Sequence, residues 1–159
     1  MSSDDLALPP PARVGVVGFS QRHFDHEAAR AHLRRLLTPL LAGRAGVELV
    51  SGLTNQGVPK LAYELGVELG CVTVGFSAKQ AVRARAGTFP VDRRILVGER
   101  YGDESEAFVA YIDALVRVGG GPQSRDEVAR FRAKLGDDPA LLAGRLFEAE
   151  VDWFGPARA

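Results

Sequence analysis

The 159-residue sequence predicts a single α/β domain that is built on a parallel β-sheet. Short apolar, β-branched runs alternate along the chain with segments of helical spacing, as in consecutive βαβ units. The runs are apolar almost throughout, which is typical of strands that are covered by helices on both faces. Apolar content of 46% and charged content of 25% are ordinary for one globular domain of this length. We therefore predict a Rossmann-like parallel sheet of about five or more strands, flanked by helices and followed by a helical C-terminus.

The chain begins with a segment, residues 1–12, that is predicted to be a disordered leader. It ends in Pro9-Pro10-Pro11, a stiff polyproline run, and the domain then covers residues 13–159. The apolar runs predict five strands, at residues 13–19, 47–51, 71–76, 94–97 and 114–118.

Segments of helical spacing separate and follow these strands. Before the fifth strand they lie at residues 24–42, 58–69, 78–86 (the least regular) and 104–111. After it, two helices are predicted at 127–135 and 139–153, with Asp138 as the N-cap of the second, and no further strand. The apolar stripe of the last helix is expected to pack on the sheet or to form a subunit interface.

Composition and charge exclude several classes of partner. Twenty basic and twenty acidic residues give no net charge and no basic stripe, so a nucleic-acid partner is not expected. No apolar stretch is long enough to cross a membrane, and the acidic N-terminus does not resemble a signal peptide. Cys71 is the only cysteine, and His23 and His26 lack a third ligand at suitable spacing. We expect a cytoplasmic protein with no metal site.

Three of the five predicted strands end in small, polar loops that contain glycine. These loops begin at Gly18, at Ser51 and at Gly119. Because the carboxyl ends of parallel strands meet at one edge of a sheet, the three loops are expected to surround a ligand. Gly119-Gly120-Gly121 lies between a strand and a helix, where uncovered backbone N–H groups form an anion site. This pattern predicts a bound phosphate group.

The common nucleotide-binding motifs are absent. No Gly-x-Gly-x-x-Gly follows the first strand, and no acidic residue ends the second strand to hold a ribose. Gly-Lys-Ser/Thr is also absent, which excludes a P-loop. We therefore expect neither a dehydrogenase nor an NTPase.

The three loops resemble those of the Lonely-Guy-type phosphoribohydrolases and their DprA-like relatives, the SLOG superfamily, long misannotated as lysine decarboxylases. The family motif Pro-Gly-Gly-x-Gly-Thr-x-x-Glu is similar to residues 119–127, and the family's loop after the second strand is similar to residues 52–57. The family's Cys-Gly-Ser after the first strand is similar to Gly18-Phe19-Ser20. The resemblance covers residues 14–130.

The resemblance implies a set of site residues. Glu127 aligns with the family's glutamate, which acts at the scissile glycosidic bond, so it is the candidate catalytic residue, with Arg100 as a weaker one. Ser124-x-x-Glu127 also fits a helix capping box, so both interpretations stay open. The implied ligand-binding residues are Gly18, Ser20, Gly52, Thr54, Asn55, Gly57, Gly120, Gly121 and Ser124. Gly52 and Gly57 are equally explained by positive φ or close packing.

The sequence departs from the family pattern at several places. Gly119 replaces the motif's proline, and Gln123 replaces its third glycine. Glu104-Ser105 stands where catalytic members carry an Arg-Lys pair, with Arg100 one helical turn earlier. The further strand that hydrolytic members have after the motif helix is not predicted here. The resemblance therefore implies ligand binding more strongly than catalysis.

The predicted function is binding of a nucleotide or a nucleotide-derived phosphorylated ligand, as a sensor or carrier. The alternative is a phosphoribohydrolase that cleaves the N-glycosidic bond of a nucleoside 5′-monophosphate, so enzymatic activity is left open. Some relatives resemble molybdenum-cofactor carriers and others resemble sensors of NAD-derived messengers. Such proteins are commonly dimers, so a homodimer is expected, without a resident cofactor. DNA binding of the DprA kind is disfavoured by the zero net charge.

Overall fold

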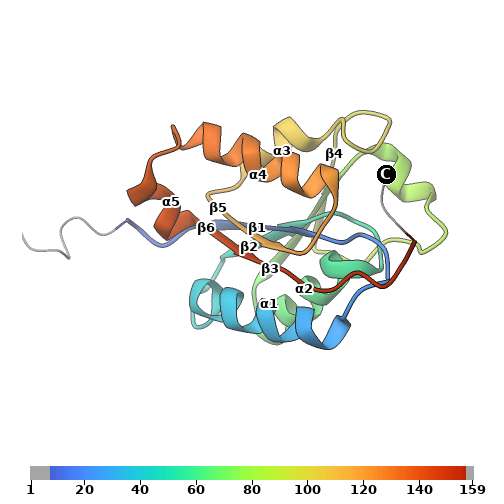
Figure 1. The fold of residues 1–159 in the computed structure, drawn as a ribbon, viewed down its shortest axis with the longest axis horizontal. Helices are drawn as coiled ribbons and strands as arrows, with labels where there is room; N and C mark the ends of the chain where they lie inside the picture. The colour runs from blue at the N-terminus through green and yellow to red at the C-terminus, as the bar shows by residue number, and fades with distance from the viewer. Residues whose placement is uncertain (1–7, 157–159) are drawn as a thin grey trace, which may run out of the picture.

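The computed structural model describes residues 8–156 and contains a six-stranded parallel sheet in the order β4-β3-β2-β1-β5-β6 (Figure 1). From β1 the chain builds one half of the sheet outwards to β4, and it then crosses to the other side of β1. The switch point therefore lies between β1 and β5, where open α/β sheets form their ligand crevice. The strands are β1 (Arg13–Gly18), β2 (Glu48–Ser51), β3 (Val72–Ser77), β4 (Arg93–Leu96), β5 (Ala114–Val118) and β6 (Leu146–Ala149).

Helices cover both faces of the sheet, as Figure 1 shows. α1 (His26–Leu41) and α2 (Gly57–Glu68) pack on one face, and α3 (Ser105–Tyr111) and α4 (Pro122–Lys134) pack on the other. α5 (Pro139–Arg145) leads into β6. These layers confirm the predicted Rossmann-like α/β fold, with α4 and α5 as the predicted C-terminal helices.

The alternation of side chains along each strand divides the core between the two faces. On β1, Val14 and Val16 belong to the cluster under α1 and α2, whereas Val17 belongs to the cluster under α3 and α4. On β5, Val116 belongs to the first cluster and Leu115 to the second. Because both faces are buried, these strands are apolar at consecutive positions, which made them recognisable in the sequence.

The five predicted strands are confirmed to within a residue or two at each end. The least regular predicted helix, residues 78–86, is a short 3₁₀ helix (Lys79–Arg83). Asp138 is confirmed as the N-cap of α5, since its Oδ1 accepts a hydrogen bond of 2.9 Å from the backbone N–H of Ala140.

The predicted helix over residues 139–153 is wrong beyond Arg145. α5 ends there and β6 pairs with β5, so the chain has the further strand that the sequence analysis did not predict. Leu146 packs towards the α3–α4 face and Phe147 towards the α1–α2 face. Two consecutive apolar residues bury one side chain on each face of a sheet, but the same two residues also fit the apolar stripe of a helix. The sequence pattern alone therefore does not distinguish the two.

The predicted start of the motif helix is also wrong. α4 begins at Pro122, five residues before Glu127, and Gly121 is its N-cap without a side-chain hydrogen bond. Proline suits the first helical position, where its ring already sets φ and an N–H is not needed. Ser124 and Glu127 therefore lie inside the helix, and the Ser124–Glu127 capping box does not form.

Residues 1–7 of the predicted leader lie outside the described residues. Residues 8–12 have no helix or strand but contact the domain. The Pro9 carbonyl accepts a hydrogen bond from Arg145, and the Ala12 N–H donates one of 3.2 Å to Asp113. Among residues 8–156, we find no helix whose length and apolarity would let it span a membrane.

Candidate functional site

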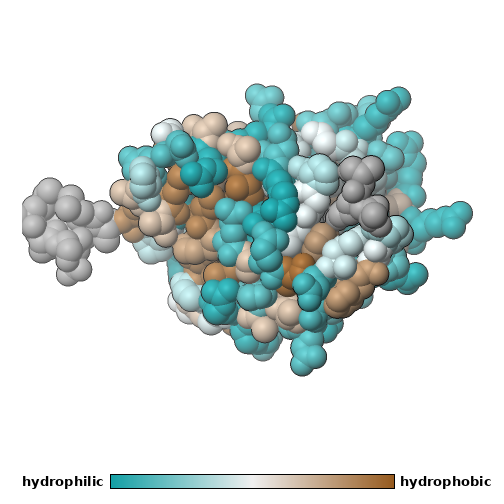
Figure 2. Space-filling view, viewed as in Figure 1, coloured by the Kyte–Doolittle hydropathy of each residue, from teal (hydrophilic) through white to brown (hydrophobic). Residues whose placement is uncertain are grey.

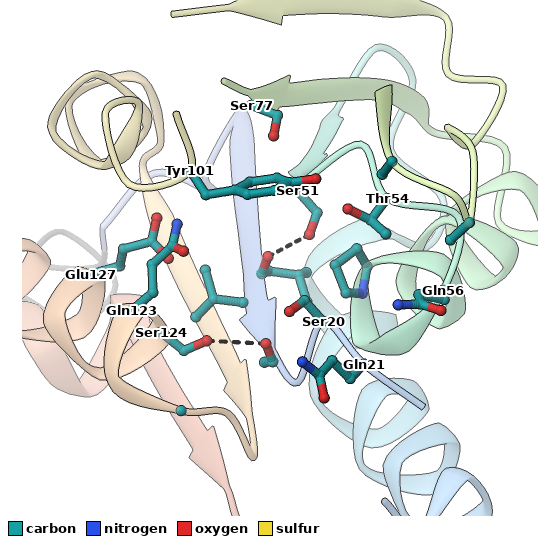
Figure 3. A pocket seen from close by; sticks show the side chains of 18 of the residues that line it. Ser20, Gln21, Ser51, Thr54, Gln56, Ser77, Tyr101, Gln123, Ser124 and Glu127 are labelled. Atoms are coloured by element: carbon teal, nitrogen blue, oxygen red, sulfur yellow. Dashed lines mark hydrogen bonds between the residues drawn. The ribbon is translucent and has the colours of Figure 1, made fainter. Parts of the chain in front are cut away.

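A cleft of about 830 Å³ opens at the carboxyl edge of the sheet, above the switch point between β1 and β5 (Figure 3). Its walls come from the loops after β1 and β2, the end of β3, the segments before α3 and the first turn of α4. The size is in the usual range of about 300–1,000 Å³ for small-molecule sites. This is the edge at which the sequence predicted a ligand.

The glycine turn after β5 has a backbone that only glycine adopts readily. Gly119 has φ of 60° and Gly120 has φ of 108°. A Cβ on Gly120 would lie 2.7 Å from the Ser124 Cβ and 3.2 Å from the Gly18 Cα. Gly119 is fixed on both sides, since its N–H donates to the Ala149 carbonyl at 2.8 Å and its carbonyl accepts from Arg117 at 2.8 Å. The turn therefore has a defined shape before any ligand binds.

Four backbone N–H groups of this turn have no acceptor among residues 8–156. They belong to Gly120, Gly121, Gln123 and Ser124, and the first hydrogen bond of the helix is donated by Arg125 to the Gly121 carbonyl at 3.2 Å. Unsatisfied N–H groups at a helix N-terminus carry partial positive charge and bind anions. Gly121, Gln123 and Ser124 line the cleft, so a phosphate group can reach this site.

The Ser124 hydroxyl has a different partner from the one the sequence suggested. It donates a hydrogen bond of 3.1 Å to the Gly18 carbonyl, which Figure 3 shows as a dashed line. This bond joins the first turn of α4 to the end of β1. Ser124 therefore holds the two loops together, and its backbone N–H is the group available to a ligand.

The loops after β1 and β2 are also joined through the backbone. The Phe19 carbonyl accepts a hydrogen bond of 2.7 Å from Val58 in the first turn of α2. Gly57 has φ of 74°, and a Cβ there would lie 2.4 Å from the Phe19 oxygen. Gly57 is thus required for the close approach, whereas a Cβ on Gly52 would meet only Pro59, at 3.9 Å.

The structure brings most of the predicted residues to the cleft. Gly18, Ser20, Gly52, Thr54, Gly121, Ser124 and Glu127 line it. Gly57 and Gly120 shape its loops without lining it, and Asn55 holds the second loop through its N–H, which donates to the Gly87 carbonyl at 3.0 Å. Arg100 is not among the residues that line this cleft but lines a second, adjoining cavity.

Two buried glutamates form one wall of the cleft. Glu104 and Glu127 are 5% and 6% exposed, and both line the cleft. Glu104 accepts hydrogen bonds from the Gln123 side chain at 3.1 Å and from the Gly102 N–H at 3.0 Å. Burial, followed by repulsion from Glu104, raises the pKa of Glu127 to about 8, despite a hydrogen bond from Ser105. Glu127 is therefore a carboxyl group that keeps its proton near neutral pH.

Sequence reasoning missed two residues of the far wall, Ser77 and Tyr101. Figure 3 shows the Ser77 hydroxyl directed into the cleft and the Tyr101 ring reaching across it above Ser51. Ser77 is only 4% exposed, and its hydroxyl has no partner in the described part of the chain. Ser77 ends β3, and Tyr101 lies in the segment that follows β4. Ligands bind outside the carboxyl ends of the strands in a parallel sheet, so examining the residues that follow all five predicted strands would have found both.

Within residues 8–156, no three His, Cys, Asp or Glu side chains gather in a way that could hold a metal ion. The polar groups that the cleft offers are backbone N–H groups, hydroxyls, two carboxyl groups, glutamine amides, the His23 ring and the side chains of Arg22 and Arg85. These groups suit a polar organic ligand with an anionic end.

No protein-family model and no curated protein matches this sequence. Among solved structures, the molybdenum cofactor binding protein from the phototrophic bacterium Rippkaea orientalis is similar, with a TM-score of 0.59 and 19% sequence identity. The similarity covers 91% of this chain and 92% of that chain. At this level of identity the likeness shows the Rossmann-like fold alone.

Proposed function

We propose that the chain binds a nucleotide or a nucleotide-derived phosphorylated ligand in the cleft, as a sensor or carrier. The observation that carries the proposal is the set of four unpartnered N–H groups on the glycine turn, placed at the switch point of the sheet. The phosphate lies on these groups, beside Gly18 and Ser20. The ribose and base lie across the cleft towards Thr54, Ser77 and Tyr101.

The same geometry supports a proposed membership in the Lonely-Guy/DprA superfamily. The three loops that carry the resemblance come from β1, β2 and β5, and each contributes residues to one cleft. The presence of β6 after the motif helix removes one of the departures from the family pattern. The similar structure from Rippkaea orientalis is described as a molybdenum cofactor binding protein, which favours including that cofactor among the ligands to be tested.

Binding is tested by calorimetric titration with AMP, GMP, CMP and UMP. We expect at least one monophosphate to bind and the corresponding nucleoside to bind at least ten-fold more weakly. Ser20→Asp places a negative charge beside the proposed phosphate and is expected to weaken binding at least ten-fold. Ala45→Asp adds the same charge in the exposed loop between α1 and β2, at the opposite edge of the sheet, and is expected to leave binding unchanged. Failure of every phosphorylated compound to bind at millimolar concentration contradicts the proposal.

Glu127 favours a second candidate function, hydrolysis of the N-glycosidic bond. A carboxyl group that is protonated near neutral pH can give its proton to the leaving base. Water then adds to C1′ of the ribose as the bond between C1′ and the base nitrogen breaks. The bond's electron pair stays on that nitrogen, which takes the proton of Glu127, and the proton lost by the water restores the carboxyl group. The products are ribose 5-phosphate and the free base.

Chromatography of each monophosphate after incubation with the protein tests this second function. Release of free base that is lost in Glu127→Gln establishes the hydrolase, and release is expected to decline above the Glu127 pKa of about 8. Binding of a monophosphate without release of free base contradicts the hydrolase and supports the function of a sensor or carrier.

We also propose that the chain forms a homodimer. β6 is the outermost strand, and an unpaired strand edge readily pairs with another chain. Figure 2 shows apolar surface where Figure 1 places α5 and β6, and the apolar side chains of Leu141, Leu146 and Phe147 remain partly exposed there. Light scattering is expected to give twice the chain mass of 17.1 kDa, and a monomer mass at micromolar concentration contradicts this proposal.

A further inference from the structure

The cleft differs in chemistry between its two ends. At the glycine turn it offers backbone N–H groups, whereas at the end of β3 it is lined by Phe76 and Ser77. The Phe76 ring packs edge to face against the Phe108 ring, with 5.9 Å between the ring centroids. Phe108 and the Tyr101 ring, which is 45% exposed, also line the cleft. The end of the cleft at β3 therefore has an aromatic wall.

The hydroxyl of Ser77 is buried in this wall without a hydrogen-bond partner among residues 8–156. The side chain is 4% exposed, and Figure 3 shows its oxygen directed into the cleft. The backbone around it is fixed, because Ser77 pairs with Leu96 on β4 and its carbonyl accepts a hydrogen bond of 2.9 Å from Val97. Ser77 therefore presents a hydroxyl of fixed position to a ligand in the cleft.

The other buried serines that line the cleft are already bonded within the chain. Ser51, at the end of the neighbouring strand β2, donates to the Val16 carbonyl at 2.6 Å. Ser124 donates to the Gly18 carbonyl at 3.1 Å. Buried hydroxyls in native proteins have hydrogen-bond partners as a rule, so the free hydroxyl of Ser77 points to a partner that the ligand supplies.

We propose that the aromatic wall binds the base of the ligand and that Ser77 is a specificity-determining residue whose hydroxyl forms a hydrogen bond with that base. An aromatic heterocycle suits this wall, because its ring packs on aromatic side chains while its nitrogen and oxygen atoms need a polar partner. A sugar phosphate without a base then binds weakly. This inference rests on the proposed function, because it assigns the phosphate on the glycine turn to the same ligand.

The test compares phosphates with and without a base. AMP, GMP, CMP, UMP and ribose 5-phosphate are titrated by calorimetry into the wild type and into Ser77→Ala. We expect at least one monophosphate to bind the wild type about ten-fold or more tightly than ribose 5-phosphate does. Ser77→Ala is expected to weaken binding of that monophosphate about three- to ten-fold. Its affinity for ribose 5-phosphate is expected to stay within two-fold of the wild type.

Thermal unfolding of the free protein separates this role from a structural one. Ser77→Ala removes no hydrogen bond within the described chain, so its melting temperature is expected not to fall. Thr73→Val is the matched control, since it removes a buried hydroxyl from the other end of β3, away from the cleft. That hydroxyl bonds the Asp92 carboxylate at 3.1 Å, so the control is expected to lose stability and to keep both affinities.

Ser77→Cys has nearly the volume of the wild type and a weaker hydrogen-bonding group, so its affinity for the monophosphate is expected to lie between those of the wild type and Ser77→Ala. It supplies the comparison if the alanine variant does not fold. Equal affinity of the wild type for the monophosphates and ribose 5-phosphate overturns the inference. Unchanged monophosphate binding in the Ser77 variants, or equal weakening of both classes of compound, also overturns it. In those cases the phosphate site on the glycine turn stands, whereas failure of all five compounds to bind overturns both proposals.

Discussion

The carboxyl group of Glu127 lies among groups that oppose its ionisation. Burial contributes most, and Glu104 and Asp126 add negative charge nearby. Its pKa is raised to about 8, so the folded chain keeps a proton that the unfolded chain releases near pH 4.5. Between these values the unfolded state binds fewer protons than the folded state. The free energy of unfolding therefore falls as pH rises through this window.

Glu127→Gln is expected to remove this contribution. The glutamine cannot ionise, so the stability of the variant relative to the wild type rises with pH by at most about 1.4 kcal/mol per unit between the two pKa values. Urea unfolding at pH 5, 7 and 9 measures the difference. Glu64→Gln, which removes an exposed carboxyl group on α2 away from Glu127, is the control. A difference between Glu127→Gln and wild type that is constant with pH contradicts the altered pKa.

Two glycines of the site differ in what they do, and substitution separates them. Gly120→Ala is expected to lose about 1–3 kcal/mol of stability, because φ of 108° and the Ser124 Cβ both oppose a side chain. Gly52→Val fits the backbone and extends into the cleft, so stability changes little while ligand binding is lost. Thermal unfolding and calorimetry measure the two effects. Equal loss of stability in both variants contradicts the distinction.

At the scale of elements, Arg117 on β5 connects the last strand to the glycine turn. It is 4% exposed and bonds Glu148 at 2.6 Å, Glu150 at 2.7 Å and the Gly119 carbonyl at 2.8 Å. Its two acidic partners are 35% and 64% exposed at the side chain, so water solvates them when the arginine is absent. Water cannot solvate the buried Arg117 guanidinium in the same way when the two glutamates are absent.

This asymmetry predicts unequal costs for removing the two sides of the network. Arg117→Met leaves exposed carboxylates and one carbonyl without its donor, at a cost of about 1–3 kcal/mol. Glu148→Gln with Glu150→Gln leaves a buried, uncompensated guanidinium, at a cost of about 3 kcal/mol or more. Urea unfolding of the two variants decides between them. A larger loss in Arg117→Met would contradict the account.

The elements also show where sequence patterns are insufficient. Leu142, Leu146 and Phe147 fit one helical stripe, yet α5 ends at Arg145 and the next two residues face opposite sides of a strand. β6 pairs with β5, and Arg117 on β5 bonds Glu148 on β6, a long-range contact that local periodicity does not reveal. Similarly, Ser124 and Glu127 match a capping box, but Pro122 already begins the helix.

At the scale of the whole molecule, the sequence predicted the sheet and the edge that carries the site. Strands that are apolar on both faces and glycine loops at their ends are local signals, so they are visible without a structure. The strand order is not local, and it makes β1 and β5 neighbours, which brings Gly18 against Gly120. The buried pair of Glu104 and Glu127 depends on the same folding and was not predicted as a pair.

The anion site on the glycine turn is most directly tested by nuclear magnetic resonance of the ¹⁵N-labelled protein. A nucleoside monophosphate that binds is titrated into the sample, and the backbone amide shifts are followed. The account predicts that the largest shifts belong to the three amides that line the cleft and whose hydrogens gain an acceptor: Gly121, Gln123 and Ser124. Saturable binding with these three amides unmoved would contradict it.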